Sequence, residues 1–151
     1  MKVISKYLYS ELLKPFLIFS FTFIGILWLV QILPKLETLV LNKQPLTIFF
    51  NVAMHTIPQV AYFVIPVAAF FSTIYAINKL VSETEIVAIA SSGFSFLFFT
   101  KIIFIFGLTV SLILFLITFF VLPKSAFKLQ SIFFDIEQNF ATKFIDSGKF
   151  L

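Results

Sequence analysis

The chain has 151 residues, of which 60% are hydrophobic and 12% are charged, and its net charge is +4. A soluble domain carries about a quarter charged residues, so this composition leaves too little polar surface to face water. Together with a mean hydropathy of +1.08, it excludes a soluble enzyme, a nucleic-acid-binding protein and a disordered chain. The sequence therefore predicts an integral membrane protein.

The first membrane span is predicted at residues 15–34, a run of 20 uncharged residues between Lys14 and Lys35. A helix of this length is about 30 Å long, which matches the hydrocarbon core of a bilayer. A cleaved signal peptide is disfavoured because the apolar run is too long and no small-residue cleavage site comes after it. The span must be helical, since lipid offers no partner for an unpaired amide.

The second span is predicted at residues 46–78, within a longer uncharged region. Pro58 and Pro66 lie inside it and predict a kink, because proline removes a helical hydrogen bond. The third span is predicted at residues 96–122, so the fold class is an all-α membrane protein with three transmembrane helices.

A polar stripe runs along the first half of the second span. Asn51, His55 and Gln59 stand at i, i+4 and i+8, which places them on one helical face. One interpretation is a face that lines a cavity or a substrate path. The other is that this half of the helix rises into the headgroups, where polar side chains cost little; the sequence leaves both open.

A short helix is predicted at residues 82–92, between the second and third spans. Ser82 and Glu85 have the spacing of a capping box, in which Ser82 caps the helix and Glu85 reaches back to it. Gly93 is placed to end the helix in a left-handed conformation. This helix either rests on the membrane interface or is the segment that a cytoplasmic partner binds in order to move the transmembrane helices.

The tail, residues 124–151, carries apolar residues at helical spacing with charged residues between them. These apolar residues are Phe127, Ile132, Phe133, Ile136, Phe140 and Phe144. We expect a turn at Asp146-Ser147-Gly148. The stripe has no evident surface to pack on and is typical of an element that has been cut short.

Motifs for chemistry are missing from the sequence. There is no phosphate-binding glycine loop, no cysteine, and no second histidine or acidic cluster that would build a metal site. We therefore predict no catalytic residue, no metal site and no cofactor, and a protein that is not an enzyme.

Four features together resemble a known family. They are ISKYLYSELLKPF before the first span, VIPVAAFFSTIYAINKL in the second, LVSETEIVAIASSGFS after it, and Pro123 at the end of the third. The most specific pattern is matched by Leu80, Glu83, Thr84, Glu85, Ile86, Ile89, Gly93 and Ser95. The chain resembles the lipopolysaccharide export permeases of the LptF/LptG (YjgP/YjgQ) family, with the LptF type preferred, although Ser91-Ser92-Gly93 departs from the usual Ala-Cys-Gly or Ala-Gly.

The resemblance implies a subunit of an ABC-type exporter in the bacterial inner membrane. Such a permease extracts lipopolysaccharide and passes it to a periplasmic bridge formed by LptC and LptA. A separate cytoplasmic ATPase, LptB, hydrolyses ATP, and a paralogous permease, LptG or LptF, completes the pair. The alternative is a small, self-contained three-span structural or assembly protein with no transported substrate.

The resemblance also assigns roles to residues. The helix at 82–92 becomes the coupling helix that contacts the ATPase, through Glu83, Glu85, Ile86, Ile89 and Gly93. Family members place basic residues near the outer end of the first span, where this chain has Gln31 and Lys35. With the polar stripe of Asn51, His55 and Gln59, these residues make up the expected substrate path.

Orientation and domain layout are inferred from charge and from the resemblance. Lysines ahead of the first span favour a cytoplasmic N-terminus. Residues 1–123 would then hold the spans and the coupling helix, and residues 124–151 would be a periplasmic helix leading into a β-jellyroll. Family members continue through that jellyroll and three more spans, so we expect this chain to be an N-terminal fragment.

Overall fold

The computed structural model describes residues 2–93 and 95–147, with side chains described for residues 3–93 and 95–138. Over these residues the chain is helical and contains no strand. The elements are α1 (Lys2–Leu41), α2 (Leu46–Ser82), α3 (Glu85–Ser91), α4 (Phe96–Leu116), the π-helix η1 (Ile117–Val121) and α5 (Leu122–Ser147).

Three helical segments are long and apolar enough to cross a membrane. They are Val3–Leu41, Leu46–Ser82 and Phe96–Gln138. The predicted all-α architecture with three spans is confirmed. Each helix extends beyond its predicted span.

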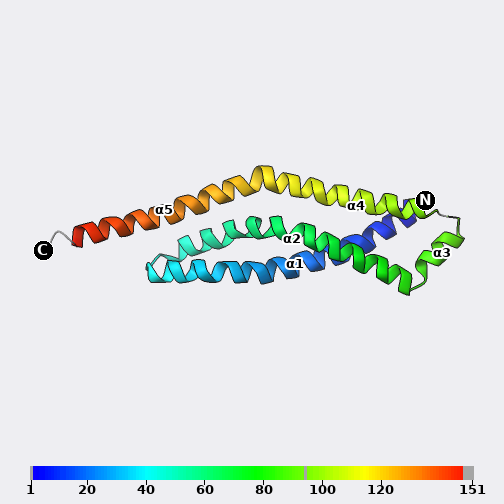
Figure 1. The fold of residues 1–151 in the computed structure, drawn as a ribbon, viewed down its shortest axis with the longest axis horizontal. Coiled ribbons are helices and arrows are strands. Elements are labelled where there is room, and N and C mark those ends of the chain that lie inside the picture. The colour runs from blue at the N-terminus through cyan, green and yellow to red at the C-terminus, as the bar shows by residue number, and fades with distance from the viewer. Residues whose placement is uncertain (1, 94, 148–151) are drawn as a thin grey trace.

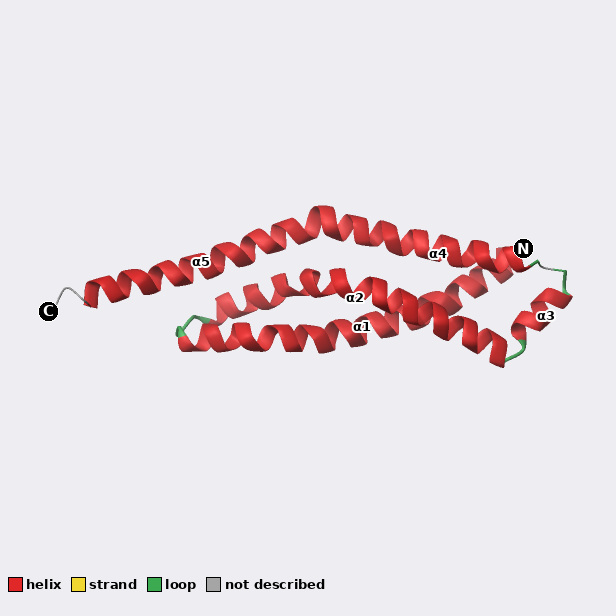
Figure 2. Cartoon of the chain, viewed as in Figure 1, coloured by secondary structure: helices red, strands yellow, loops and turns green. Residues whose placement is uncertain are grey.

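The helices form an elongated bundle (Figure 1). α1 and α2 make an antiparallel hairpin, and the rod of α4, η1 and α5 lies alongside it. The N-terminus and α3 lie at one end of the bundle, and the turn between α1 and α2 lies toward the other. Figure 2 shows that the described loops are confined to these ends.

The larger hydrophobic core lies in the half of the bundle that bears the N-terminus. Phe106 of α4 is 2% exposed, and its ring meets that of Phe16 edge to face at 5.6 Å. Ala68 and Ala76 of α2 are fully buried, and such small side chains let neighbouring helices approach closely. Close packing, rather than exclusion of water, holds α1, α2 and α4 together in lipid.

A second core joins α5 to the other end of the hairpin. Leu129 and Ile136 of α5 pack against a buried group formed by Ile32, Leu39, Val52 and Ala53. The prediction that the apolar stripe has nothing to pack on was wrong. The hairpin that receives α5 is built from residues far away in sequence, so no local pattern in the tail reveals it.

Individual residues of that stripe differ in burial. Ile136 is 5% exposed and Phe127 is 74% exposed, while Ile132 and Phe133 are half-buried against the second core. Phe140 and Phe144 lie outside the described side chains. The stripe is therefore buried over its middle part, as far as its side chains are described.

The third helix continues past Pro123, where the sequence suggested an exit from the span. The π-helix η1 ends two residues before this proline, and the amide of Leu122 donates to the carbonyl of Ile117, five residues back. A π turn widens the helix and shifts its backbone hydrogen bonds to partners five residues apart. Proline therefore bends the helix here without ending it. Figure 1 shows the bend between α4 and α5.

The turn expected at residues 146–148 is also corrected. Asp146 and Ser147 are helical, because α5 runs to Ser147. Gly148 and the expected start of a strand lie outside the described residues.

α2 remains one helix through Pro58 and Pro66, and Figure 1 shows it bowed. Close to this bow, Trp28 of α1 donates its indole N–H to the backbone oxygen of Ala53 at 3.0 Å. This bond lies in the turns before Pro58, where proline interrupts the ladder. Trp28 therefore fastens α1 to the weakened part of α2.

Candidate functional site

The short helix between the second and third spans begins three residues later than predicted. α2 runs to Ser82, and α3 begins at Glu85 after a turn in which Thr84 has a φ of 56°. An N-cap residue needs a non-helical backbone, and Ser82 is still inside α2. The predicted capping box was therefore wrong: Thr84 precedes α3, and no side chain caps it.

The end of α3 agrees with the sequence analysis. Gly93 has a φ of +89°, and its amide donates to the carbonyl of Ala90 at 3.0 Å. A side chain is strained in this conformation whereas glycine is not. The left-handed exit predicted at Gly93 is confirmed.

Glu85 contacts α1 rather than its own helix. Both of its carboxylate oxygens lie 3.0 Å from the hydroxyl of Tyr7, which donates to them. The two residues are 78 positions apart, so no local pattern relates them, and the sequence analysis did not identify Tyr7. This bond ties the beginning of α3 to the second turn of α1.

The two faces of α3 differ. Ile86 and Ile89 are half-buried and pack against the larger core. Val87 is 68% exposed, and Ala88 and Ala90 are exposed beside it. The outward face of α3 is therefore small and apolar.

The residues assigned to ATPase coupling thus occupy different positions. Glu83 and Gly93 are exposed at the two ends of α3. Glu85 is bonded to α1, while Ile86 and Ile89 face inward. Three of the five therefore lie on α3, on different sides of it, while Glu83 precedes the helix and Gly93 follows it.

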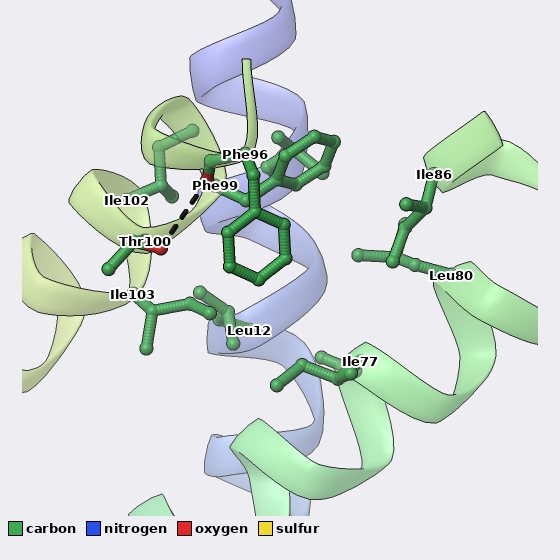
Figure 3. A pocket seen from close by; sticks show the side chains of 11 residues that line it. Leu12, Ile77, Leu80, Ile86, Phe96, Phe99, Thr100, Ile102 and Ile103 are labelled. Atoms are coloured by element: carbon green, nitrogen blue, oxygen red, sulfur yellow. Dashed lines mark hydrogen bonds between the residues drawn. The ribbon is translucent and has the colours of Figure 1, made fainter. Parts of the chain in front are cut away.

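A small apolar cavity of about 100 Å³ lies behind α3. Figure 3 shows Leu80 and Ile86 facing Phe96 across it. All but one of its lining residues are apolar, Thr100 being the exception. The cavity thus lies between α3 and the beginning of α4.

An ion pair joins α1 to α2 near the same end. The ammonium of Lys79 lies 2.6 Å from one carboxylate oxygen of Glu11, and that of Lys14 lies 3.7 Å from the other. The side chain of Glu11 is 8% exposed, so its charge depends on these lysines for compensation. Neither Glu11 nor Lys79 was singled out in the sequence, and Lys14 served there only to limit the first span and to indicate its orientation.

At the other end, the expected substrate-path residues do not form one cluster. Lys35 of α1 donates to the hydroxyl of Thr56 at 3.1 Å, and Thr56 is fully buried in α2. Gln31 is exposed and Gln59 is half-buried. Lys35 is therefore joined to α2 through Thr56, a residue that the sequence analysis did not single out.

Asn51 and His55 bond to their own helix. The amide of Asn51 donates to the carbonyl of Thr47 at 3.1 Å. Nδ1 of His55 lies 2.7 Å from the carbonyl of Asn51, a contact that needs the proton on Nδ1 because a carbonyl only accepts. These local bonds satisfy polar groups but do not point them toward Lys35.

The residues with described side chains contain no group of three His, Cys, Asp or Glu that would hold a metal ion. The site therefore consists of a short surface helix fastened to α1 at one end of the bundle, and a lysine bonded to a buried threonine toward the other end.

Comparison with known proteins decides the family. The sequence matches the family described as lipopolysaccharide export system permease LptF/LptG over residues 6–151. The chain belongs to the LptF/LptG family. The match includes Tyr7, all three spans and α3, and it does not distinguish the LptF type from the LptG type.

A relative of this LptF/LptG family member is the uncharacterized protein RP871 of Rickettsia prowazekii (strain Madrid E). The two are 26% identical over 145 residues, which cover 96% of this chain and 40% of that protein. The chain thus spans about two fifths of the length of this curated relative. No solved structure matches the chain.

Family membership and the three apolar helices together make the chain a multi-pass membrane protein of the permease type. The structure adds two contacts that the family description does not name: the bond between Tyr7 and Glu85, and the bond between Lys35 and Thr56.

Proposed function

We propose that the chain acts as a permease subunit of an ABC-type exporter that extracts lipopolysaccharide from the bacterial inner membrane. The lipopolysaccharide then passes to a periplasmic bridge. The observation that carries this proposal is the family match over residues 6–151, which covers nearly the whole chain. The three apolar helices fit the membrane part of such a subunit.

The partners proposed are those of the export system. A paralogous permease of the LptG or LptF type completes the pair, with this chain as the LptF-type member. LptB hydrolyses ATP on the cytoplasmic side, and LptC and LptA form the bridge. ATP hydrolysis thus belongs to a separate subunit, and this chain is not itself an enzyme.

The proposed orientation puts the N-terminus and α3 in the cytoplasm and residues 124–151 in the periplasm. Lys14 and Lys79 are close enough to share Glu11, and they lie toward the end of the bundle that bears the N-terminus. A concentration of lysine favours the cytoplasmic side.

Under this orientation α3 is the coupling helix. It connects two spans at the end of the bundle, and none of its residues is buried. Its outward face offers Val87 and two alanines to a partner. Glu83 and Glu85 add negative charge at its beginning, which suits a basic residue of LptB.

Lys35 is proposed to meet the anionic headgroup of lipopolysaccharide. An ammonium has three N–H donors, and the bond to the neutral hydroxyl of Thr56 uses one of them. The charge of Lys35 is thus held in place without being neutralised by Thr56. Gln31, Asn51, His55 and Gln59 complete the proposed path on the same half of the hairpin.

Depletion of the complete gene product in its own host tests the proposal. Newly made lipopolysaccharide should accumulate in the inner membrane while its amount in the outer membrane falls. Unchanged delivery to the outer membrane after depletion would contradict the proposed function.

A further inference from the structure

A surface groove lies between the first two turns of α1 and the helix α3. Its volume is about 360 Å³. The residues that line it are Val3, Ile4 and Tyr7 of α1, and Glu85, Ala88 and Ile89 of α3. Half of the lining residues therefore belong to α1 and not to α3, the proposed coupling helix.

The groove has one charged end. The carboxylate of Glu85 lies within it, bonded to the hydroxyl of Tyr7 through both oxygens. A phenol is neutral at ordinary pH, so Tyr7 orients this carboxylate without cancelling its charge. The remaining lining residues are aliphatic, and the groove thus suits a ligand that carries a basic group next to an apolar one.

The walls of the groove are open to a partner. Val3 is 82% exposed and Tyr7 is 40% exposed, and Val87 is 68% exposed on the adjoining outward face of α3. Exposed apolar residues at the end of a membrane bundle are suited to a protein interface. Because Tyr7 joins the two helices, a partner that binds one of them also contacts a surface fixed to the other.

We propose that the surface that docks the cytoplasmic ATPase is composite, formed by α3 together with Val3, Ile4 and Tyr7 of α1. A basic side chain of LptB pairs with Glu85, and an apolar side chain next to it packs between Val3 and Ile89. Tyr7 is a positioning residue that presents the Glu85 carboxylate to the partner. This inference rests on the proposed function.

The composite surface has a mechanical consequence. Movement of the ATPase displaces α1 as well as α3, because the two helices are held by one partner and by the bond between Tyr7 and Glu85. α1 also carries Lys35 toward its other end. A displacement at the cytoplasmic groove is thereby passed to the proposed substrate path along a single helix.

Photocrosslinking tests the direct contact. A photoreactive residue at position 3, in the complete gene product expressed with its export partners, should capture LptB. The same probe at Leu41, which is 74% exposed at the far end of α1, should not. Capture of lipid alone at position 3 would show that the membrane occupies the groove and would overturn the proposal.

A pair of matched variants tests the role of Tyr7. Tyr7→Phe removes only the hydroxyl, and we expect LptB to bind about tenfold more weakly or worse, as for a lost hydrogen bond to a charged group. Tyr9→Phe removes a hydroxyl two residues away, from a ring that packs on Phe106, and should leave binding unchanged. Equal binding by Tyr7→Phe and the parent, or equal losses in both variants, would contradict a positioning role.

A probe at Val87 separates this inference from the proposed function. Capture of LptB at both 3 and 87 supports the composite surface. Capture at 87 without capture at 3 keeps α3 as the coupling helix and overturns the contribution of α1. Capture at 3 alone overturns the composite surface, and capture at neither position overturns both proposals.

Discussion

Glu85 has one observed contact and one proposed role. Its carboxylate accepts the hydroxyl of Tyr7 and thereby joins two helices, and we propose that the same carboxylate meets a basic partner residue. Sequence analysis identified the residue but gave it the wrong local contact, because the capping-box rule considers only neighbours along the chain. The two properties can be separated by mutation, since loss of the hydrogen bond would release α3 from α1, whereas loss of the charge would weaken the proposed contact with LptB.

Substitutions at Glu85 in the complete gene product separate these roles. Glu85→Ala should detach LptB while the protein stays in the membrane. Glu85→Gln keeps an acceptor for Tyr7 but removes the charge; if the charge is the contact, it should also lose LptB, at a cost of roughly 2–5 kcal/mol of binding. Co-purification and titration with LptB measure both. Full binding by both variants would show that α3 is not the coupling helix.

Lys35 provides a second test at the level of a residue. With a photoreactive probe at the exposed neighbour Gln31, Lys35→Ala should reduce capture of lipopolysaccharide about tenfold or more, as expected for one lost charge-assisted contact. Lys101→Ala, an exposed lysine of α4, is the control and should leave capture unchanged. Equal capture in all three proteins would remove Lys35 from the substrate path.

Among the helical elements, the spans were predictable and their ends were not. Uninterrupted apolar residues identify a membrane helix directly, because the bilayer selects for length and composition. The bounds depend on the backbone around each end: Pro123 bends the third helix because η1 accommodates it, and α2 runs on through Ser82. The position of α5 was also beyond prediction, since Leu129 and Ile136 are buried by residues of α1 and α2.

The docking of α5 yields a prediction for the element. Ile136→Ala should loosen α5 from the hairpin, and the cavity left by a buried isoleucine costs about 2–4 kcal/mol. Backbone amides of residues 124–138 should then exchange faster with deuterium. Phe127→Ala alters an exposed position of the same helix and is the control. Unchanged exchange in Ile136→Ala would mean that the second core does not hold α5.

At the scale of the whole molecule, the fold separates two regions along one axis. The groove between α1 and α3 lies at the end that bears the N-terminus, while Lys35 and the docked α5 lie in the other half (Figure 1). The hairpin of α1 and α2 connects them through continuous helices. Such an arrangement suits a subunit whose helices are displaced by a partner on one side of a membrane and which moves a ligand on the other side.

Reporter fusions test this orientation. A fusion after Ser125 should be active in the periplasm and inactive in the cytoplasm, and a fusion after Ser92 should show the reverse pattern. The reason is that, in the proposed topology, α4 and η1 cross the membrane between these two points. Cytoplasmic activity after Ser125 would contradict the proposed topology.

Reconstituted transport shows directly whether the chain takes part in ATP-driven export of lipopolysaccharide. The complete gene product, its paralogous permease and LptB are placed in liposomes with lipopolysaccharide and LptC, and the lipopolysaccharide that reaches added LptA is quantified. We predict transfer that requires ATP and is lost in Glu85→Ala. Transfer that is absent in the parent, or equal with and without ATP, would contradict the account.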